Sequence, residues 1–275
     1  MSIMYNSIFV GDNNHKISPS SLTNFYRNPK EWLQNFEGHV TFEGNAATIL
    51  GTCIHYVFEC NFNKTTDEQY WKDVKEYCQE QASKNVISEA EYTDIIATTT
   101  EMYPQLIEWI QDTDTVDIMY SEPAVKYKLP TSITGKVDND YYVAGSIDAI
   151  IFDETANSKH QFGIRDYKTS KRKVSSISNY IHQLVTYAVS WNSTHSDDEQ
   201  VGFVEVVNIY NTKTKGVQFN VIRKYLTPEL VTGLENILKE IVLSHKAIIK
   251  YPQLRPFMFR DGVDFMGKLS PLGEK

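Results

Sequence analysis

Hydrophobic residues recur with helical spacing through the first part of the chain. Four segments share this pattern, at about residues 18–36, 45–62, 67–84 and 89–111. Pro104 falls inside the last of them and is expected to weaken or kink it. We predict that these helices form a cap, over about 18–112, on one side of a sheet.

Apolar runs that are typical of strands follow this helical region. They lie near residues 122–129, 141–152, 161–168, 201–210 and 217–222. A helix over about 176–192 separates the third run from the fourth. A last helix starts at Thr227-Pro228, with proline at its first position, and its apolar stripe reaches about Ile249. The order predicts an α/β fold.

The chain shows no internal repeat, low-complexity tract or long linker, which favours one domain over 1–275. Its core is expected over about 120–250, and a carboxy-terminal tail over 251–275 has no clear period. No apolar stretch approaches 18 residues and no signal peptide is recognisable, so we expect no membrane association. Three scattered cysteines favour a reducing compartment, either the cytoplasm of a cell or that of an infected host.

The net charge of −8 argues against a protein that wraps nucleic acid over a large surface. A local basic cluster nevertheless lies between residues 165 and 173. It comprises Arg165, Lys168, Lys171, Arg172 and Lys173. A solvated loop is the ordinary interpretation of such a cluster. Its position next to the acidic residues described below favours a role in binding.

Two aspartates occur where aspartate is disfavoured. Asp148 lies within the apolar run of residues 143–152, and Asp166 lies in the run of residues 161–168. A hairpin centred on Asn157 would place Asp166 directly opposite Asp148, with both side chains on one face. Two carboxylates so close repel each other unless a divalent cation lies between them. Lys168, two residues after Asp166, would share their face.

Six segments together resemble the PD-(D/E)XK nuclease superfamily, in particular its RecB-like branch, to which CRISPR-adaptation nucleases belong. The segments are Ile17–Trp32, Gly51–Glu59, Ser121–Leu129, Gly145–Asp148, Asp166–Lys168 and Gln183–Tyr187. They occur in the family's order between about Ile17 and Tyr187. The resemblance implies a restriction-endonuclease-like fold, with a mixed central sheet flanked by helices and a helical amino-terminal or inserted region.

The resemblance also assigns roles to individual residues. The implied metal ligands are His55, Asp148, Asp166 and the backbone carbonyl of Tyr167. The implied catalytic residues are Lys168, Asp148, Asp166 and Glu59. Gln183 and Tyr187 would support the lysine and contact nucleic acid, with Lys171, Arg172 and Lys173 beside them. Hard oxygen ligands suit Mg²⁺ or Mn²⁺, and the one imidazole favours Mn²⁺.

Some members of the branch hold an iron–sulfur cluster with four cysteines, and this chain departs from that pattern. Asn28 stands at the position of one cluster cysteine, and only Cys53, Cys60 and Cys78 are present. We therefore expect no cluster.

Each matching residue also has a simpler interpretation when it is taken alone. His55 fits an ordinary helix histidine, Glu59 a surface acid, and the Asp166–Lys168 pair a surface ion pair. Gln183 and Tyr187 fit polar positions of an amphipathic helix. All of these would have to hold together to defeat the nuclease interpretation.

The expected function is a metal-dependent DNA exonuclease that hydrolyses phosphodiester bonds in recombination, repair or processing. Its partner would be DNA, as a single strand or a duplex end. The chain lacks a Walker-type loop, so a helicase, recombinase or single-strand-binding protein would be the partner in any unwinding. The alternatives are a structure-specific endonuclease, a catalytically silent nuclease-like domain that binds DNA or protein, and a metal-binding structural protein.

Overall fold

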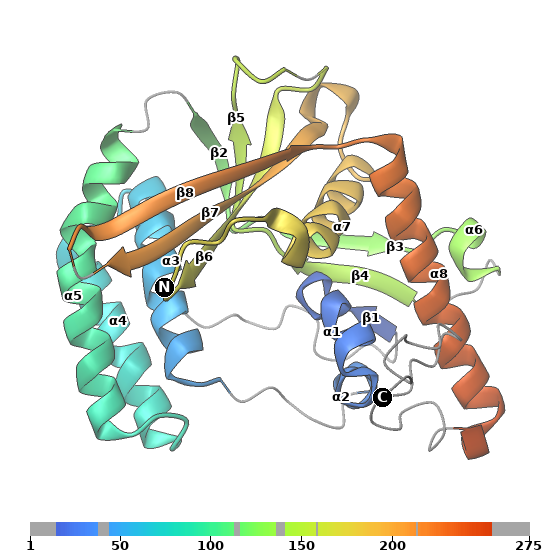
Figure 1. Ribbon diagram of the computed structural model, residues 1–275, viewed down its shortest axis with the longest axis horizontal. Helices are drawn as coiled ribbons and strands as arrows, with labels where there is room; N and C mark the ends of the chain where they lie inside the picture. Colours follow the sequence, from blue (N-terminus) through green and yellow to red (C-terminus); the bar gives the residue numbers. More distant parts are fainter. Residues whose placement is uncertain are drawn as a thin grey trace.

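The strands of the protein form two mixed sheets. The computed structural model describes residues 15–37, 44–112, 116–135, 141–157, 159–212 and 214–254. The smaller sheet has the order β1–β4–β3, with bounds β1 His15–Ile17, β4 Tyr141–Ser146 and β3 Ala124–Lys128. The larger has the order β2–β5–β6–β7–β8, with bounds β2 Asp117–Ser121, β5 Ala149–Phe152, β6 Phe162–Ser170, β7 Val201–Thr212 and β8 Gly216–Tyr225. The predicted α/β fold with mixed pairing and flanking helices is confirmed (Figure 1).

The strand predicted near 122–129 is β3, but the prediction of one continuous strand over 141–152 was wrong, because it is divided into β4 and β5. The chain passes from one sheet to the other at residues 122–123, between β2 and β3, and at residues 147–148, between β4 and β5. The pairs Ala124↔Ser146 and Ser121↔Ala149 keep the same register, so one antiparallel pair is bent in the middle. The bend begins at Glu122, whose φ of 51° is left-handed, and continues through a proline, which has no N–H for a ladder.

Three helices cover one face of the larger sheet. They are α3 Ala46–Phe62, α4 Asp67–Ser83 and α5 Glu89–Asp112. Asn45 and Thr66 cap the first two, because their side chains accept from backbone N–H groups of the first turn. The helix α5 continues through Pro104 to Asp112, so the proline does not end it.

The remaining amino-terminal helices lie elsewhere. The helix expected over 18–36 is divided at Asn28 into α1 Leu22–Arg27 and α2 Pro29–Phe36, after a 3-10 turn at Pro19–Ser21. These pack into a core shared with α8, Pro228–Lys250. Figure 1 shows α3–α5 at one side of the strands and α1, α2 and α8 at the other. The amino-terminal helices thus form two groups rather than one cap.

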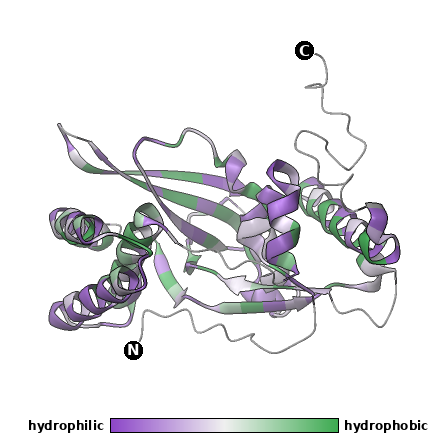
Figure 2. Cartoon of the chain, turned by 90° about the horizontal axis from the view of Figure 1, so that it is seen from below, coloured by the Kyte–Doolittle hydropathy of each residue, from purple (hydrophilic) through white to green (hydrophobic). Residues whose placement is uncertain are grey.

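Helix α7, Ile181–Asn192, packs on the other face of the larger sheet, after a 3-10 turn at Ile177–Asn179. Among the described residues, the elements that were not predicted include the strands β1 and β2, the helix α6 Thr131–Thr134 and a 3-10 turn at Asp197–Glu199. In Figure 2, α8 turns hydrophobic positions towards the strands and hydrophilic ones outwards. Such amphipathicity explains why its sequence pattern was readable.

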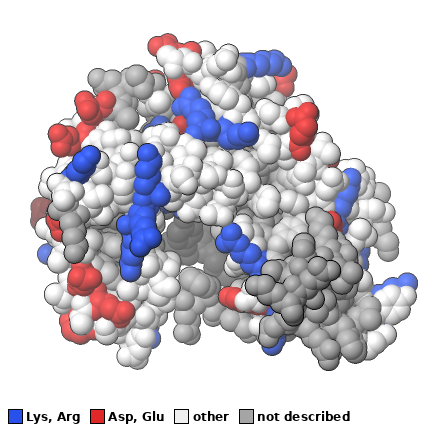
Figure 3. Space-filling view, in the orientation of Figure 1, with Lys and Arg blue, Asp and Glu red and all other residues white. Residues whose placement is uncertain are grey.

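A hollow opens between the α3–α5 side and the α1–α2 side of the molecule, and Lys and Arg side chains stand on both sides of it (Figure 3). No described helix is long and apolar enough to cross a membrane. Of the tail expected over 251–275, residues 251–254 are described, with a 3-10 turn at Pro252–Leu254. Residues 255–275 lie outside the described part of the chain.

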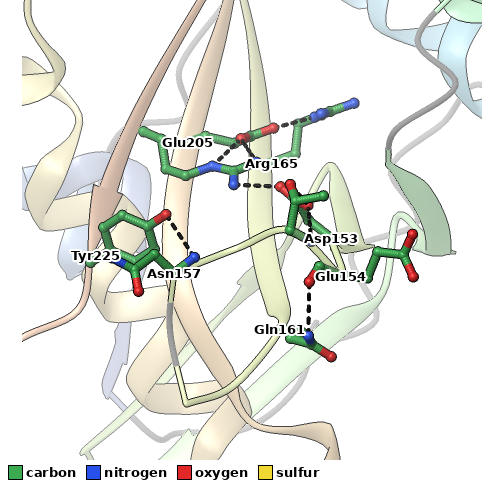
Figure 4. Close-up of polar contacts among 9 residues, drawn as sticks. Asp153, Glu154, Asn157, Gln161, Arg165, Glu205 and Tyr225 are labelled. Atoms are coloured by element: carbon green, nitrogen blue, oxygen red, sulfur yellow. Dashed lines mark hydrogen bonds and ion pairs between the residues drawn. The ribbon is translucent and has the colours of Figure 1, made fainter.

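A buried ionic network joins three strands of the larger sheet on the face that α3–α5 cover. Arg165, Glu205 and Arg223 are cross-strand neighbours on β6, β7 and β8. Arg165 Nε donates to Glu205 Oε1 at 2.6 Å, and Arg223 donates to Glu205 Oε2 through Nε and Nη2 at 2.9 and 2.8 Å. Arg223 also pairs with Asp153 (Figure 4). Two cations and two anions are therefore matched inside this face of the sheet.

Candidate active site

Asp148 and Asp166 lie where the two sheets meet. The strands β5 and β6 pair as Ala149↔Arg165 and Ile150↔Ile164, which is the register predicted for a hairpin centred on Asn157. The pairing ends at Ala149. Asp148 directly precedes Ala149 and lies at the bend of the chain, outside this ladder. There the N–H of Tyr167 donates to Asp148 Oδ2 at 2.7 Å. The bend therefore frees Asp148 from the ladder while keeping it beside the end of β6.

Lys168 and Gln183 hold the carboxylate of Asp166. Lys168 Nζ lies 2.8 Å from Oδ1 and 2.7 Å from Oδ2 of Asp166. Gln183 Nε2, on α7, donates to Oδ1 at 3.2 Å. The carboxylate is only 1% exposed, so these contacts compensate a charge that water cannot reach. The structure thus brings the predicted lysine and the predicted helix residue to one aspartate.

Helix α3 brings His55 to the other aspartate. His55 Nδ1 lies 3.4 Å from Asp148 Oδ2. Glu59, one helical turn later, shares the face of His55 and is half-buried. The helix can approach because residue 51 is glycine: a Cβ there would lie 3.2 Å from Thr169 Oγ1 on β6. Gly51 thus allows the close packing that places His55.

Tyr187 packs against the bend rather than projecting into solvent. Its ring and hydroxyl would lie 3.1 and 3.3 Å from a Cβ at residue 145, and Pro19 Cδ would lie 3.2 Å from it. Any side chain at Gly145 would therefore push the tyrosine or the amino-terminal turn away. Tyr187 is buried and electrostatically coupled to Asp148 and Asp166. Its position is that of a support for the aspartates.

Tyr167 separates the two faces of β6. Its backbone N–H serves Asp148, while its side chain lies on the other face and stacks on Phe58, with ring centroids 3.8 Å apart. Only the backbone of this residue is thus available to the site, as the prediction of a carbonyl ligand requires.

Glu122 was not predicted as part of the site, but the structure places it next to Asp148. It lies opposite Asp148 at the bend, where its N–H donates to the carbonyl of Asp148 at 3.1 Å. Ser146 Oγ donates to Glu122 Oε2 at 2.9 Å and holds the carboxylate in place. A non-glycine residue with a left-handed backbone conformation, such as Glu122, is strained. Strain of this kind is frequent at functional sites. The sequence signal for this residue was a glutamate directly before a proline within an expected strand.

Burial makes this group of side chains electrostatically unusual. Burial raises the pKa of Asp148, raises that of Asp166 to about 6 and, together with the charge of Asp148, raises that of Glu122 to about 8. Burial and the nearby Lys168 lower the pKa of His55 to about 4, so the imidazole is neutral. Burial opposes the charge of Lys168, but Asp166 and Asp148 outweigh it and raise its pKa. The carboxyl groups therefore outnumber the one cation among them.

The donor set fits a divalent cation in type. Within the described residues, no three His, Cys, Asp or Glu side chains are close enough together to hold a metal ion as they stand. Lys168 occupies both oxygens of Asp166 in this arrangement. Two buried carboxylates with raised pKa values and a neutral imidazole are nevertheless the ligands that bind Mg²⁺ or Mn²⁺ well.

The basic residues Lys171, Arg172 and Lys173 are exposed in the loop that follows β6. They lie three to five residues beyond Lys168. All the residues predicted for the site therefore lie on or next to α3, the bend, β6 and α7. The free thiols Cys53, Cys60 and Cys78 are buried, and Cys53 and Cys78 lie on α3 and α4 away from the bend.

Comparisons with known proteins give a family match and a similar fold for this chain. The family model described as the PD-(D/E)XK nuclease superfamily matches residues 16–254. A search of the curated proteins gave no match. Among solved structures, the chain is similar to a protein from Eubacterium rectale that is provisionally described as an exonuclease. The two share 11% sequence identity with a TM-score of 0.53, over 90% of this chain and 86% of the other, which indicates a common fold.

Proposed function

Because the chain belongs to the PD-(D/E)XK nuclease superfamily, we propose that it is a divalent-metal-dependent deoxyribonuclease that removes nucleotides from DNA ends. Nucleases of this superfamily generally use divalent metals and act on DNA. The proposal extends this to Mg²⁺ or Mn²⁺ as the metal, to the ends of single strands or duplexes as the substrate, and to recombination or repair in the cytoplasm as the setting.

One observation carries the proposal: Asp148, whose side chain is 10% exposed, and the buried Asp166 lie together with His55 and, among the described residues of the site, with one cation, Lys168. A folded protein keeps such an excess of buried carboxylates only if something else compensates it. A divalent cation would do so. In the proposed holoprotein it is held by His55, Asp148, Asp166 and the carbonyl of Tyr167.

The bound cation would supply positive charge at the scissile phosphate and make a nearby water more acidic. The chain's own groups account for the rest. Lys168 orients the attacking water and stabilises the charge that develops on the phosphate, because its ammonium is held close to Asp166. Gln183 fixes Asp166, and Tyr187 supports the bend that carries Asp148. Glu59 and Glu122 add carboxyl groups at the edge of the site. In-line attack leaves a 5′-phosphate and a 3′-hydroxyl.

The preference for ends rests on two features of the chain. Its sequence pattern reveals no sequence-recognition module, and among the described residues the basic loop Lys171–Lys173 follows directly after the strand that carries Lys168. The fold is also shared with a protein that is provisionally described as an exonuclease. Helicases, recombinases or single-strand-binding proteins are the protein partners that such an activity would serve.

The test is a cleavage assay at low salt on linear single-stranded, linear duplex and closed circular DNA, with and without Mn²⁺ or Mg²⁺. Wild type and Lys168→Ala are compared. We expect metal-dependent loss of linear DNA only, abolished by the substitution. Cleavage of circles would replace the exonuclease with an endonuclease. DNA binding without cleavage of any substrate would leave a silent nuclease-like domain.

A further inference from the structure

Asn208 is a buried polar residue in the middle of an apolar strand. It is 0% exposed. Within residues 201–209 of β7, Glu205 is the one other residue with a charged or amide side chain. A buried carboxamide is costly unless its donors and acceptor are used. The hydrogen bonds of its side chain all run to one short stretch of chain, residues 168–174.

These hydrogen bonds close a loop at its base. Asn208 Nδ2 donates to the carbonyl of Lys168 at 3.3 Å and to Ser170 Oγ at 2.8 Å. Asn208 Oδ1 accepts from the N–H of Val174 at 2.7 Å. One carboxamide therefore binds the backbone at both ends of the loop that carries Lys171, Arg172 and Lys173.

A second asparagine completes the arrangement. Asn220 on β8 is the cross-strand partner of Asn208, and its Nδ2 donates to the carbonyl of Val174 at 2.9 Å. The N–H and the carbonyl of Val174 are thus held by two neighbouring asparagines. We name Asn208 and Asn220 the asparagine clamp. Lys168, the partner of Asn208 in the register of β6 and β7, lies in the same cross-strand row.

We infer that the asparagine clamp positions the loop of Lys171, Arg172 and Lys173 as a grip for the phosphates next to the scissile bond. The inference rests on the proposed function and deepens it, since it names the part of the substrate that the loop contacts. Three residues span at most about 10 Å, so the loop reaches the phosphates that follow the one held at Lys168. A clamped loop loses little conformational freedom when it binds a strand, which makes each contact more effective.

The test measures binding of a labelled single-stranded oligonucleotide without divalent metal, over a series of salt concentrations. Each phosphate contact contributes about 0.7 to the slope of log affinity against log salt for a single strand. A variant with Lys171, Arg172 and Lys173 all replaced by alanine should lose about 2 from that slope. Asn208→Ala and Asn220→Ala should lower the slope towards that of the triple variant. In the cleavage assay, their KM should rise by a larger factor than their kcat falls.

Asn211→Ala is the matched control. Asn211 lies on the same strand, is exposed, and contacts Glu101 rather than the loop. It should bind with the wild-type slope. Asn220→Ala decides the question if Asn208→Ala does not fold, because Asn220 is only half-buried and makes one bond to the loop.

Folded clamp variants that keep the wild-type slope and affinity would overturn the inference while leaving the proposed nuclease intact. A lower slope in Asn211→Ala as well would also overturn it, since the effect would then be general. A wild-type chain that neither binds nor cuts DNA would overturn the proposed function, and the clamp's role in binding with it.

Discussion

Two groups of buried charges lie on opposite faces of β6, and they begin at consecutive residues. Arg165 turns towards α3–α5 and belongs to the ionic network of Figure 4, in which Glu205 is bonded by two guanidinium groups. Asp166 turns towards α7 and belongs to the acidic site, in which Lys168 is the cation. Both groups include a buried residue of β6, and these two residues are adjacent in sequence. The groups differ in the balance between positive and negative charges.

The difference separates structure from function. In the network, Arg165 and Arg223 match Glu205 and Asp153 in number, and burial does not prevent the hydrogen bonds to Thr155 and Arg223 from lowering the pKa of Asp153. In the site, burial raises the pKa of Asp148 and Asp166. We propose on this basis that the balanced group serves the fold and that the unbalanced group binds a cation.

The largest expected effect comes from the unbalanced group. Asp148→Asn should lower the cleavage rate by about 10³-fold or more, the upper range for loss of one preorganised electrostatic group. It should leave thermal stability unchanged or raise it, because it removes a buried charge that lacks a full partner. Cleavage assays and thermal unfolding measure the two effects. A large loss of stability would show that Asp148 belongs to the fold instead.

The balanced group should behave in the opposite way. Glu205→Gln removes the carboxylate that Arg165 and Arg223 share, leaves Arg223 with Asp153 alone, and should cost about 3–5 kcal/mol of unfolding free energy. Cleavage per folded molecule should stay at the wild-type level, which denaturant unfolding combined with activity assays can establish. Equal stability of the variant and the wild type would contradict the role of the network.

Glu122 tests where the site ends. If its carboxylate supports Asp148 at the bend, Glu122→Gln should reduce activity or metal affinity by about 10–100-fold, as the loss of a supporting partner does. A titration of activity against Mn²⁺ concentration measures this effect. Ser146→Ala, which removes the hydroxyl that holds Glu122, should shift the titration in the same direction but less. No shift in either variant would exclude Glu122 from the site.

The smallest effect concerns Asp153 at the edge of the network. Its lowered pKa means that the carboxylate stabilises the fold above its unfolded value of about 3.9 and that this contribution is lost as the pH falls. Asp153→Asn should therefore be less stable than wild type by about 1–2 kcal/mol near neutrality. The difference should shrink on titration from about pH 5 to pH 3. A stability difference between variant and wild type that is constant with pH would show that the ionised form of Asp153 does not stabilise the fold.

Much of the fold was readable from periodic patterns. The helices α3, α4 and α8 show a helical period of hydrophobic residues, and their caps or starts at Asn45, Thr66 and Thr227 follow local rules. The register of β5 and β6 followed from a symmetric hairpin because the turn-forming stretch lies midway between the two aspartates. The bend at Glu122 was not readable, since it depends on pairing between segments about 25 residues apart.

The candidate site was predicted in part because several of its residues are close in sequence. Asp148, Asp166 and Lys168 are close in sequence, and their spacing alone indicates a shared face. The contact of Gln183 with Asp166 needs the packing of α7 on the sheet, and only the family resemblance indicated it. Asn208 looked like one polar residue in an apolar strand until its partners in the loop were visible.

The central claim is that the buried negative charge at Asp148 and Asp166 serves to bind a divalent cation. Thermal unfolding with and without Mn²⁺ tests it most directly, in wild type, Asp148→Asn and, as a control outside the site, Asp153→Asn. Binding at 100 times the dissociation constant would add about 2.7 kcal/mol to stability. The account predicts that Mn²⁺ raises the melting temperature of wild type and Asp153→Asn but not of Asp148→Asn. An equal rise in all three proteins, or none in wild type, would contradict it.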